Sequence, residues 1–148
     1  MPDLKKSEVI ENLLTTMINI SGRKTNKGHA LFTMNNTIKQ LENKFDFLKN
    51  VQIKDIRYSE DEDPVSVMTG LDEAKPGDLG NAIHDLITNM NKNLGKDAGH
   101  FFIKELRTKL DDDNLDLIKG LGVDLGLMQL EYEVEEMERY IVKKREEK

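Results

Sequence analysis

The chain has 148 residues, of which 22 are Lys or Arg and 28 are Asp or Glu, giving a net charge of −6 at pH 7. This acidic balance disfavours non-specific binding to nucleic acids, because few cations are available to displace the counterions of the phosphate backbone. Cysteine is absent, which excludes disulfides, thiolate nucleophiles and cysteine-ligated metals and fits a reducing, cytoplasmic compartment.

A chain of this size buries about 68–70% of its unfolded surface, so residues 1–148 can form a single domain without a disulfide or a structural metal. No segment contains 18 consecutive apolar residues, so we expect no membrane span. A signal peptide is not expected, because Glu8, Asn12 and Thr15 interrupt the stretch where its apolar region would have to lie.

The first predicted element is an amphipathic helix over residues 4–21. Its apolar residues recur at spacings of three and four, as one face of a helix requires. Gly22 is predicted to end this helix, and a basic loop over residues 23–29 is predicted to follow. The stripe consists of Ile10, Leu13, Met17 and Ile20.

A second helix is predicted over residues 28–50, again with a heptad-like apolar face. The next stretch, residues 51–58, alternates apolar and polar residues at its start and is the one segment that resembles a strand. A lone strand is unstable, so it needs a partner strand. The sequence leaves open whether that partner lies in the same chain or in a second copy.

The Asp63-Pro64 pair is typical of a helix start, with Asp63 as the N-cap and Pro64 in the first helical position. We therefore predict a short helix over residues 64–71. Its buried residues would be Val65, Met68 and Leu71.

Three further helices are predicted over residues 78–94, 97–110 and 114–119. Asp78 is expected to cap the first of them and Asp113 the third, because a carboxylate accepts hydrogen bonds from the free N–H groups of a first turn. The sequence thus predicts a mainly α fold, a bundle of five to six helices with at most a short β element.

The final helix is predicted over residues 124–147, capped by Asp124, and would be about 36 Å long. This length exceeds the width of a small domain, so part of the helix must lie against something outside its own core. Its apolar residues repeat every three and four positions, as in a coiled coil, and we predict that they form a homodimer interface. They are Leu127, Leu130, Val134, Met137 and Ile141.

Four basic residues, Arg23, Lys24, Lys27 and His29, precede a predicted helix. The free N–H groups of a helix start favour anions, so these residues are a candidate site for a phosphate, a carboxylate or an acidic partner. The alternative is an ordinary solvated loop, which is the commoner meaning of such a charge cluster.

Other local motifs do not meet the requirements of known sites. The glycines of residues 120–126 have the spacing GxGxxxG with no preceding strand, which does not match a dinucleotide-binding turn. A calcium loop starting at Asp111 would need glycine and glutamate where Asp116 and Gly122 stand. The sequence therefore predicts no metal, no cofactor and no catalytic residue.

Three short stretches together resemble a known family. They are residues 28–32, residues 95–106 and the acidic heptad tail. This layout is similar to that of small archaeal signal-transduction modules of the methanogen output domain type. The resemblance implies a cytoplasmic, dimeric, non-enzymatic regulatory domain.

We therefore expect a non-enzymatic regulatory or protein-interaction module that forms a homodimer and acts in signalling. The alternative is a small-molecule sensor whose apolar pocket lies between helices and whose basic loop recognises an anionic group. Its lining would include Met90, Phe101, Phe102 and Met128.

Overall fold

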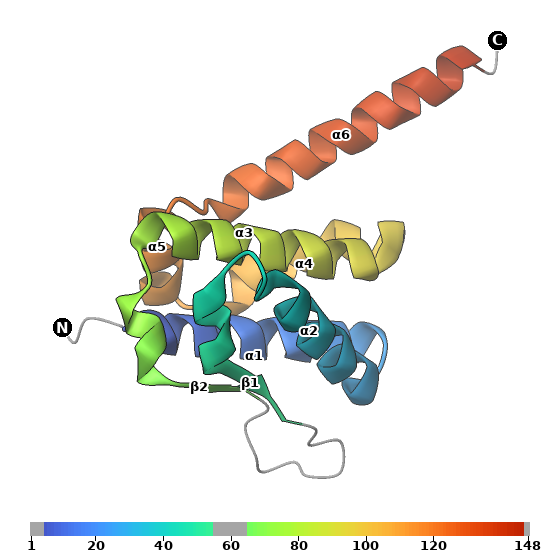
Figure 1. Ribbon diagram of the computed structural model, residues 1–148. Helices are drawn as coiled ribbons and strands as arrows, with labels where there is room; N and C mark the ends of the chain where they lie inside the picture. The colour runs from blue at the N-terminus through green and yellow to red at the C-terminus, as the bar shows by residue number, and fades with distance from the viewer. Residues whose placement is uncertain (1–4, 55–64, 147–148) are drawn as a thin grey trace.

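The computed structural model describes residues 5–54 and 65–146 (Figure 1), and it confirms the predicted mainly α fold with a short β element. Six α-helices, two short 3-10 helices (η1 and η2) and a two-stranded sheet are present in these ranges. In chain order the elements are α1 (Lys6–Lys24), α2 (Lys27–Leu41), η1 (Asp46–Asn50), β1 (Val51–Ile53), β2 (Val65–Val67), η2 (Thr69–Glu73), α3 (Pro76–Asn93), α4 (Gly95–Lys109), α5 (Asp112–Gly120) and α6 (Leu125–Glu146).

Helix α1 lies at the centre of the fold. It contacts the helices α2, α3, α4 and α5, and also β2 and η2. Its buried residues span about half of its circumference, which is wider than the stripe of about 100° typical of a surface helix. The apolar residues of α1 that are at most 2% exposed are Val9, Ile10, Leu13, Leu14, Met17, Ile18 and Ile20.

The prediction that Gly22 ends the first helix is wrong, because α1 continues to Lys24. Thr25 ends it, and the Thr25 N–H and hydroxyl both donate to the Ser21 carbonyl. Asn26 then caps α2 by accepting a hydrogen bond of 2.8 Å from the His29 N–H. The predicted basic loop is thus mostly helical.

The second helix is shorter than predicted, because α2 ends at Leu41 and not at residue 50. The chain turns there, and the Phe45 N–H donates to the Leu41 carbonyl over 2.8 Å. Phe45 and Leu48 are nevertheless buried, since the turn and η1 bring them back to the core. The spacing of the apolar residues could not distinguish a continuous helix from a helix followed by this turn, because both bury Phe45 and Leu48.

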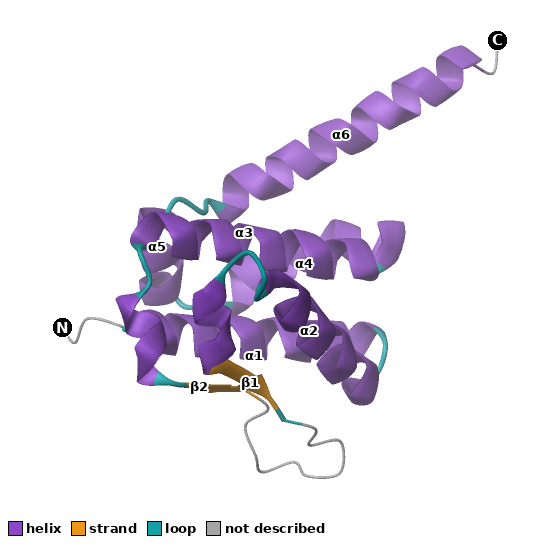
Figure 2. Ribbon diagram, in the orientation of Figure 1, coloured by secondary structure: helices purple, strands orange, loops and turns teal. Residues whose placement is uncertain are grey.

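The two strands form an antiparallel pair, with Val51 opposite Val67 and Ile53 opposite Val65 (Figure 2). The strand predicted over 51–58 therefore has its partner within the chain. Residues 55–58 of that prediction, and the Asp63-Pro64 pair, lie outside the described residues. The helix predicted over 64–71 is wrong. Val65 and Val67 alternate with Ser66, and this short β-branched alternation favours a strand.

Asp72, in η2, caps α1 from a distant part of the chain. Its carboxylate accepts a hydrogen bond of 2.8 Å from the Ser7 N–H in the first turn of α1. This bond favours the ionised form and lowers the pKa of Asp72 below its ordinary value of 3.8. Lys6 adds a second link by donating to the Ala74 carbonyl over 2.7 Å. Together these bonds fix η2 against the start of α1.

The caps of the later helices differ in part from the predictions. Lys75 and not Asp78 is the N-cap of α3, and Pro76 occupies its first position. Asp111 and not Asp113 caps α5, accepting from the Asn114 N–H over 2.9 Å. The predicted cap of the last helix is confirmed, since the Asp124 carboxylate accepts from the Leu127 N–H over 3.1 Å.

The loop between α5 and α6 crosses α3 near its N-terminal end, at Gly80. A Cβ atom at Gly80 would overlap the Leu121 carbonyl oxygen, which is backbone and cannot rotate away. Glycine is therefore required there for close approach. This contact sets the position of the loop from which α6 starts.

We expect Gly80→Ala to lower the free energy of unfolding by about 1–3 kcal/mol, as for other overpacked sites. Gly77 is the matched control, because it lies three residues earlier in α3 and a Cβ there would meet no atom within 4 Å. Gly77→Ala should be neutral or stabilising by up to about 1 kcal/mol. Urea unfolding of both variants measures the difference, and equal stabilities would contradict the proposed crossing.

Removing the distant cap by Asp72→Ala should cost about 1 kcal/mol of stability at neutral pH, as for other N-caps. Because the folded pKa of Asp72 is lowered, its contribution is complete above pH 3.8 and is lost as the pH falls through the folded value. Denaturant unfolding from pH 7 to pH 3 should show the wild type and the variant converging at the acid end. The exposed neighbour Glu73, changed to Ala, should have little effect at any pH.

Candidate functional site

Large exposed apolar side chains are concentrated on α6. The five residues of the predicted dimer interface all belong to this helix, and all are 45–65% exposed. We call them the α6 seam. Beyond the base of α6, the helix projects obliquely away from the bundle (Figure 1). The seam consists of Leu127 (53% exposed), Leu130 (56%), Val134 (45%), Met137 (65%) and Ile141 (47%).

A different face of α6 attaches the helix to the bundle. Leu125 is buried, Met128 is half-buried against the core, and α6 contacts α4. Tyr132 and Glu135 continue this face and line a small groove of about 190 Å³ with residues of α3 and α4. At 3.6 residues per turn, this face lies roughly 160° around the helix from the α6 seam. The seam therefore points away from the bundle that the same chain provides.

The positions beside the α6 seam are acidic. Glu131 and Glu138 are exposed, and Glu133 is half-buried. Glu133 accepts a hydrogen bond of 3.2 Å from the side-chain amide of Gln129, one turn earlier. An apolar stripe with charged flanks is the usual form of a helix that pairs with another helix.

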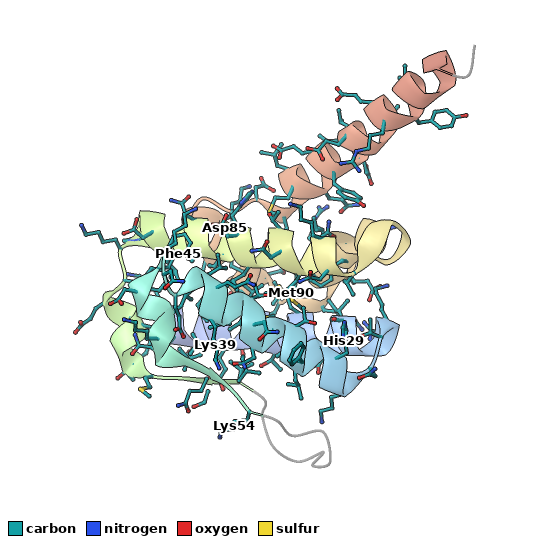
Figure 3. All side chains as sticks on the ribbon, turned by 45° about the vertical axis from the view of Figure 1, so that its right-hand side comes forward. His29, Lys39, Phe45, Lys54, Asp85 and Met90 are labelled. Carbon is teal, nitrogen blue, oxygen red and sulfur yellow. The ribbon has the colours of Figure 1, made fainter. Side chains whose placement is uncertain are left out.

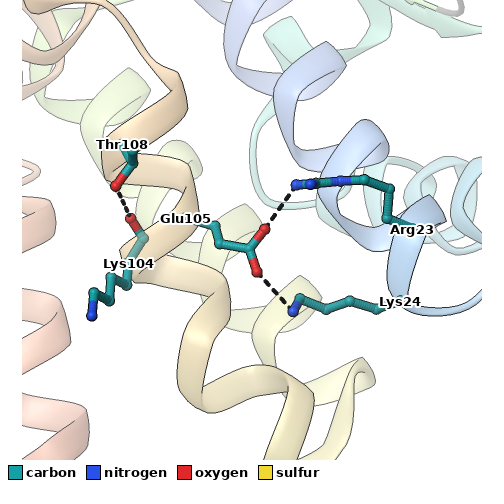
Figure 4. A network of polar contacts seen from close by, with 5 residues as sticks. All are labelled: Arg23, Lys24, Lys104, Glu105 and Thr108. Carbon is teal, nitrogen blue, oxygen red and sulfur yellow. Dashed lines mark hydrogen bonds and ion pairs between the residues drawn. The ribbon is translucent and has the colours of Figure 1, made fainter.

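Two of the four predicted anion-binding residues bind a carboxylate of the chain itself. Arg23 and Lys24, in the last turn of α1, each form an ion pair of 2.8 Å with Glu105 of α4 (Figure 4). Lys27 and His29 lie in the first turn of α2. His29 is labelled in Figure 3. The hydrogen bond from Lys24 is the main cause that lowers the pKa of Glu105 below 4.5. Anion binding at the four residues remains a prediction. An anion would have to compete with the Glu105 carboxylate for Arg23 and Lys24.

The residues predicted to line an apolar pocket do not share one environment. Met90 and Phe102 are fully buried in the core, and Met128 is half-buried at the base of α6. The side chain of Phe101 lies outside the described part of the structure. Tight burial of Met90 and Phe102 is what packing of the core requires.

Two neighbouring surface grooves lie where α1 meets the loop between α4 and α5. They have volumes of about 310 Å³ and 380 Å³, and both contain Thr16 and Lys109. The walls of the first groove are mainly polar and those of the second are polar and apolar in similar measure, whereas ligand pockets are usually apolar with a few polar groups. The other lining residues are Glu11, Asn12, Thr15, Asn19, Ile20, Arg23, Leu110, Asp111 and Asn114.

In the part of the chain that the structure describes, no three His, Asp or Glu side chains come together as metal ligands would. Within the same residues, we found no helix that combines the length and the apolar character needed to cross a bilayer. Comparison of the chain with protein-family models, with curated proteins and with solved structures found no match.

Sequence reasoning missed the contacts that join distant segments, such as the pairing of Glu105 with Arg23. These residues are 82 positions apart, and nothing near either one indicates the other. The α6 seam, by contrast, has a local signal, because helix periodicity alone places its residues on one face.

We expect Glu105→Gln to lower the free energy of unfolding by about 1 kcal/mol or less at neutral pH, as for other partly exposed ion pairs. The pKa of Glu105 is lowered, so its contribution is present above pH 4.5 and is lost as the pH falls through the folded value. Chemical unfolding at pH 7 and pH 3 measures this loss. Asp116→Asn, which removes an exposed carboxylate on α5, is the matched control and should have no effect.

Proposed function

We propose that this chain is a non-enzymatic protein-interaction module that forms a homodimer through the α6 seam. The observation that carries the proposal is the exposure of five regularly spaced apolar side chains on the side of α6 that faces away from the bundle. Contiguous exposed apolar surface of this kind marks interaction sites in soluble proteins. A cytoplasmic regulatory role in signalling, which the family resemblance implies, is part of the proposal.

The expected dimer is weak and reversible. Full burial of one Leu, Ile, Val or Met side chain is worth about 1.5–3 kcal/mol, so covering a half-exposed one gives about 1 kcal/mol. Ten such side chains in a symmetric dimer give about 10 kcal/mol, against an association cost of at least about 4 kcal/mol. The difference corresponds to a dissociation constant in the micromolar range or above.

A binding role also agrees with the structural roles of the two carboxylates whose pKa is lowered, Asp72 and Glu105. Asp72 caps α1 and Glu105 joins α1 to α4, and these structural contacts account for the lowered pKa of each. A general acid would instead need a raised pKa near neutrality. The alternative of a small-molecule sensor has less support, since Met90 and Phe102 are packed in the core.

The test is the mass of the full chain in solution, measured by sedimentation equilibrium from about 1 µM to about 500 µM, a range that spans the expected dissociation constant. The wild type should shift from 17.0 kDa towards twice that mass as the concentration rises. Met137→Asp should abolish the shift, because it places a charge in the middle of the α6 seam.

Met68→Asp is the matched control. Met68 is also an exposed methionine, 54% accessible against 65% for Met137, but it lies next to β2 and far from α6 in the sequence. This variant should dimerise as the wild type does. A wild type that stays at 17.0 kDa over the whole range, or a dimer that Met137→Asp leaves unchanged, would overturn the proposal.

A further inference from the structure

The charges beside the α6 seam bear on which partner helix fits it best. In heptad terms, Leu127, Val134 and Ile141 occupy the a positions, and Leu130 and Met137 occupy the d positions. The e and g positions are those that face the neighbouring helix across the edges of the apolar core. Between Leu127 and Ile141, these positions hold Glu131, Glu133, Glu138 and Tyr140.

Pairing of two copies therefore brings glutamates together. In a parallel pair, a g residue faces the e residue five positions later in the partner, so Glu133 of each copy faces Glu138 of the other. In an antiparallel pair, e faces e and g faces g, so the e-position glutamates of the two copies, Glu131 and Glu138, face one another. Either orientation covers the apolar seam but places glutamates of the two copies opposite each other at its edges. Their repulsion weakens self-association.

A partner helix with basic residues at its e and g positions removes this repulsion. The same apolar contacts are then flanked by pairs of opposite charge, and e and g charges are what selects one coiled-coil partner over another. The sequence of α6 also carries basic residues, but they follow Ile141 at Lys143, Lys144 and Arg145, after the end of the seam.

From this charge pattern we infer that the preferred occupant of the α6 seam is an amphipathic helix of another protein with lysine or arginine flanks. A second copy of the chain then serves as the weaker, exchangeable occupant. The inference rests on the proposed function, because it assumes that the seam is an interaction surface. It adds the chemistry of the partner and the expectation that this partner displaces the homodimer.

The experiment uses the full chain and two labelled synthetic peptides that copy residues 125–146. One peptide has the natural sequence, and the other carries Glu131→Lys, Glu133→Lys and Glu138→Lys. The two share the same apolar residues and differ in three flanking charges. We expect the lysine-flanked peptide to bind roughly tenfold more tightly in fluorescence anisotropy at low salt. The ratio should shrink as NaCl is added, since salt screens exposed pairs.

Two variants of the chain separate the seam from general electrostatic attraction. Met137→Asp makes the chain more acidic, so purely electrostatic binding of the lysine-flanked peptide would persist or increase. If the seam is the binding surface, this binding is lost instead. The double variant Glu133→Lys and Glu138→Lys should reverse the preference, so that the natural peptide binds more tightly.

Each outcome has one meaning. Equal affinity for the two peptides, both lost in Met137→Asp, would overturn the inferred partner chemistry and leave the interaction surface in place. Binding of the lysine-flanked peptide that survives Met137→Asp would overturn the inference as non-specific attraction. Failure of both peptides to bind, together with a monomeric chain, would overturn the proposed function itself.

Discussion

The burial of α1 over about half of its circumference is the constraint on which the rest of the fold depends. A helix that is covered on one side needs one neighbour, whereas α1 is in contact with four helices, a strand and a 3-10 helix. Its polar contacts are also made with distant segments, to Asp72 near the first turn and to Glu105 near the last. Folding of the bundle therefore requires these segments to assemble around α1.

The same constraint explains why α6 is left with an apolar face of its own. The buried side of α1 is already occupied by α2, α3, α4, α5, β2 and η2. Helix α6 therefore packs at the margin, against α4, through Leu125 and Met128. The opposite side of α6 keeps the spacing of a buried helix without a neighbour in the described structure. This exposed, core-like face is the basis of the interaction surface proposed above.

Much of the helical content followed from sequence periodicity, and so did the α6 seam, because helix faces are local patterns. The errors came where two conformations bury the same residues. Phe45 and Leu48 reach the core through a turn as well as through a helix, and three residues from Val65 suit a short strand as well as a helix. Contacts such as that of Glu105 with Lys24 depend on the tertiary arrangement, which no local pattern records.

The crossing of Gly80 by the Leu121 carbonyl has a mechanical consequence. The 22 residues of α6 form a rod about 33 Å long, whose base is set by this backbone contact and whose far half is clear of the bundle. A rotation of only about 10° at the base moves the tip of a rod of that length by about 6 Å. A small change in the angle at the base of α6 would therefore displace its C-terminal end by several ångströms relative to the bundle.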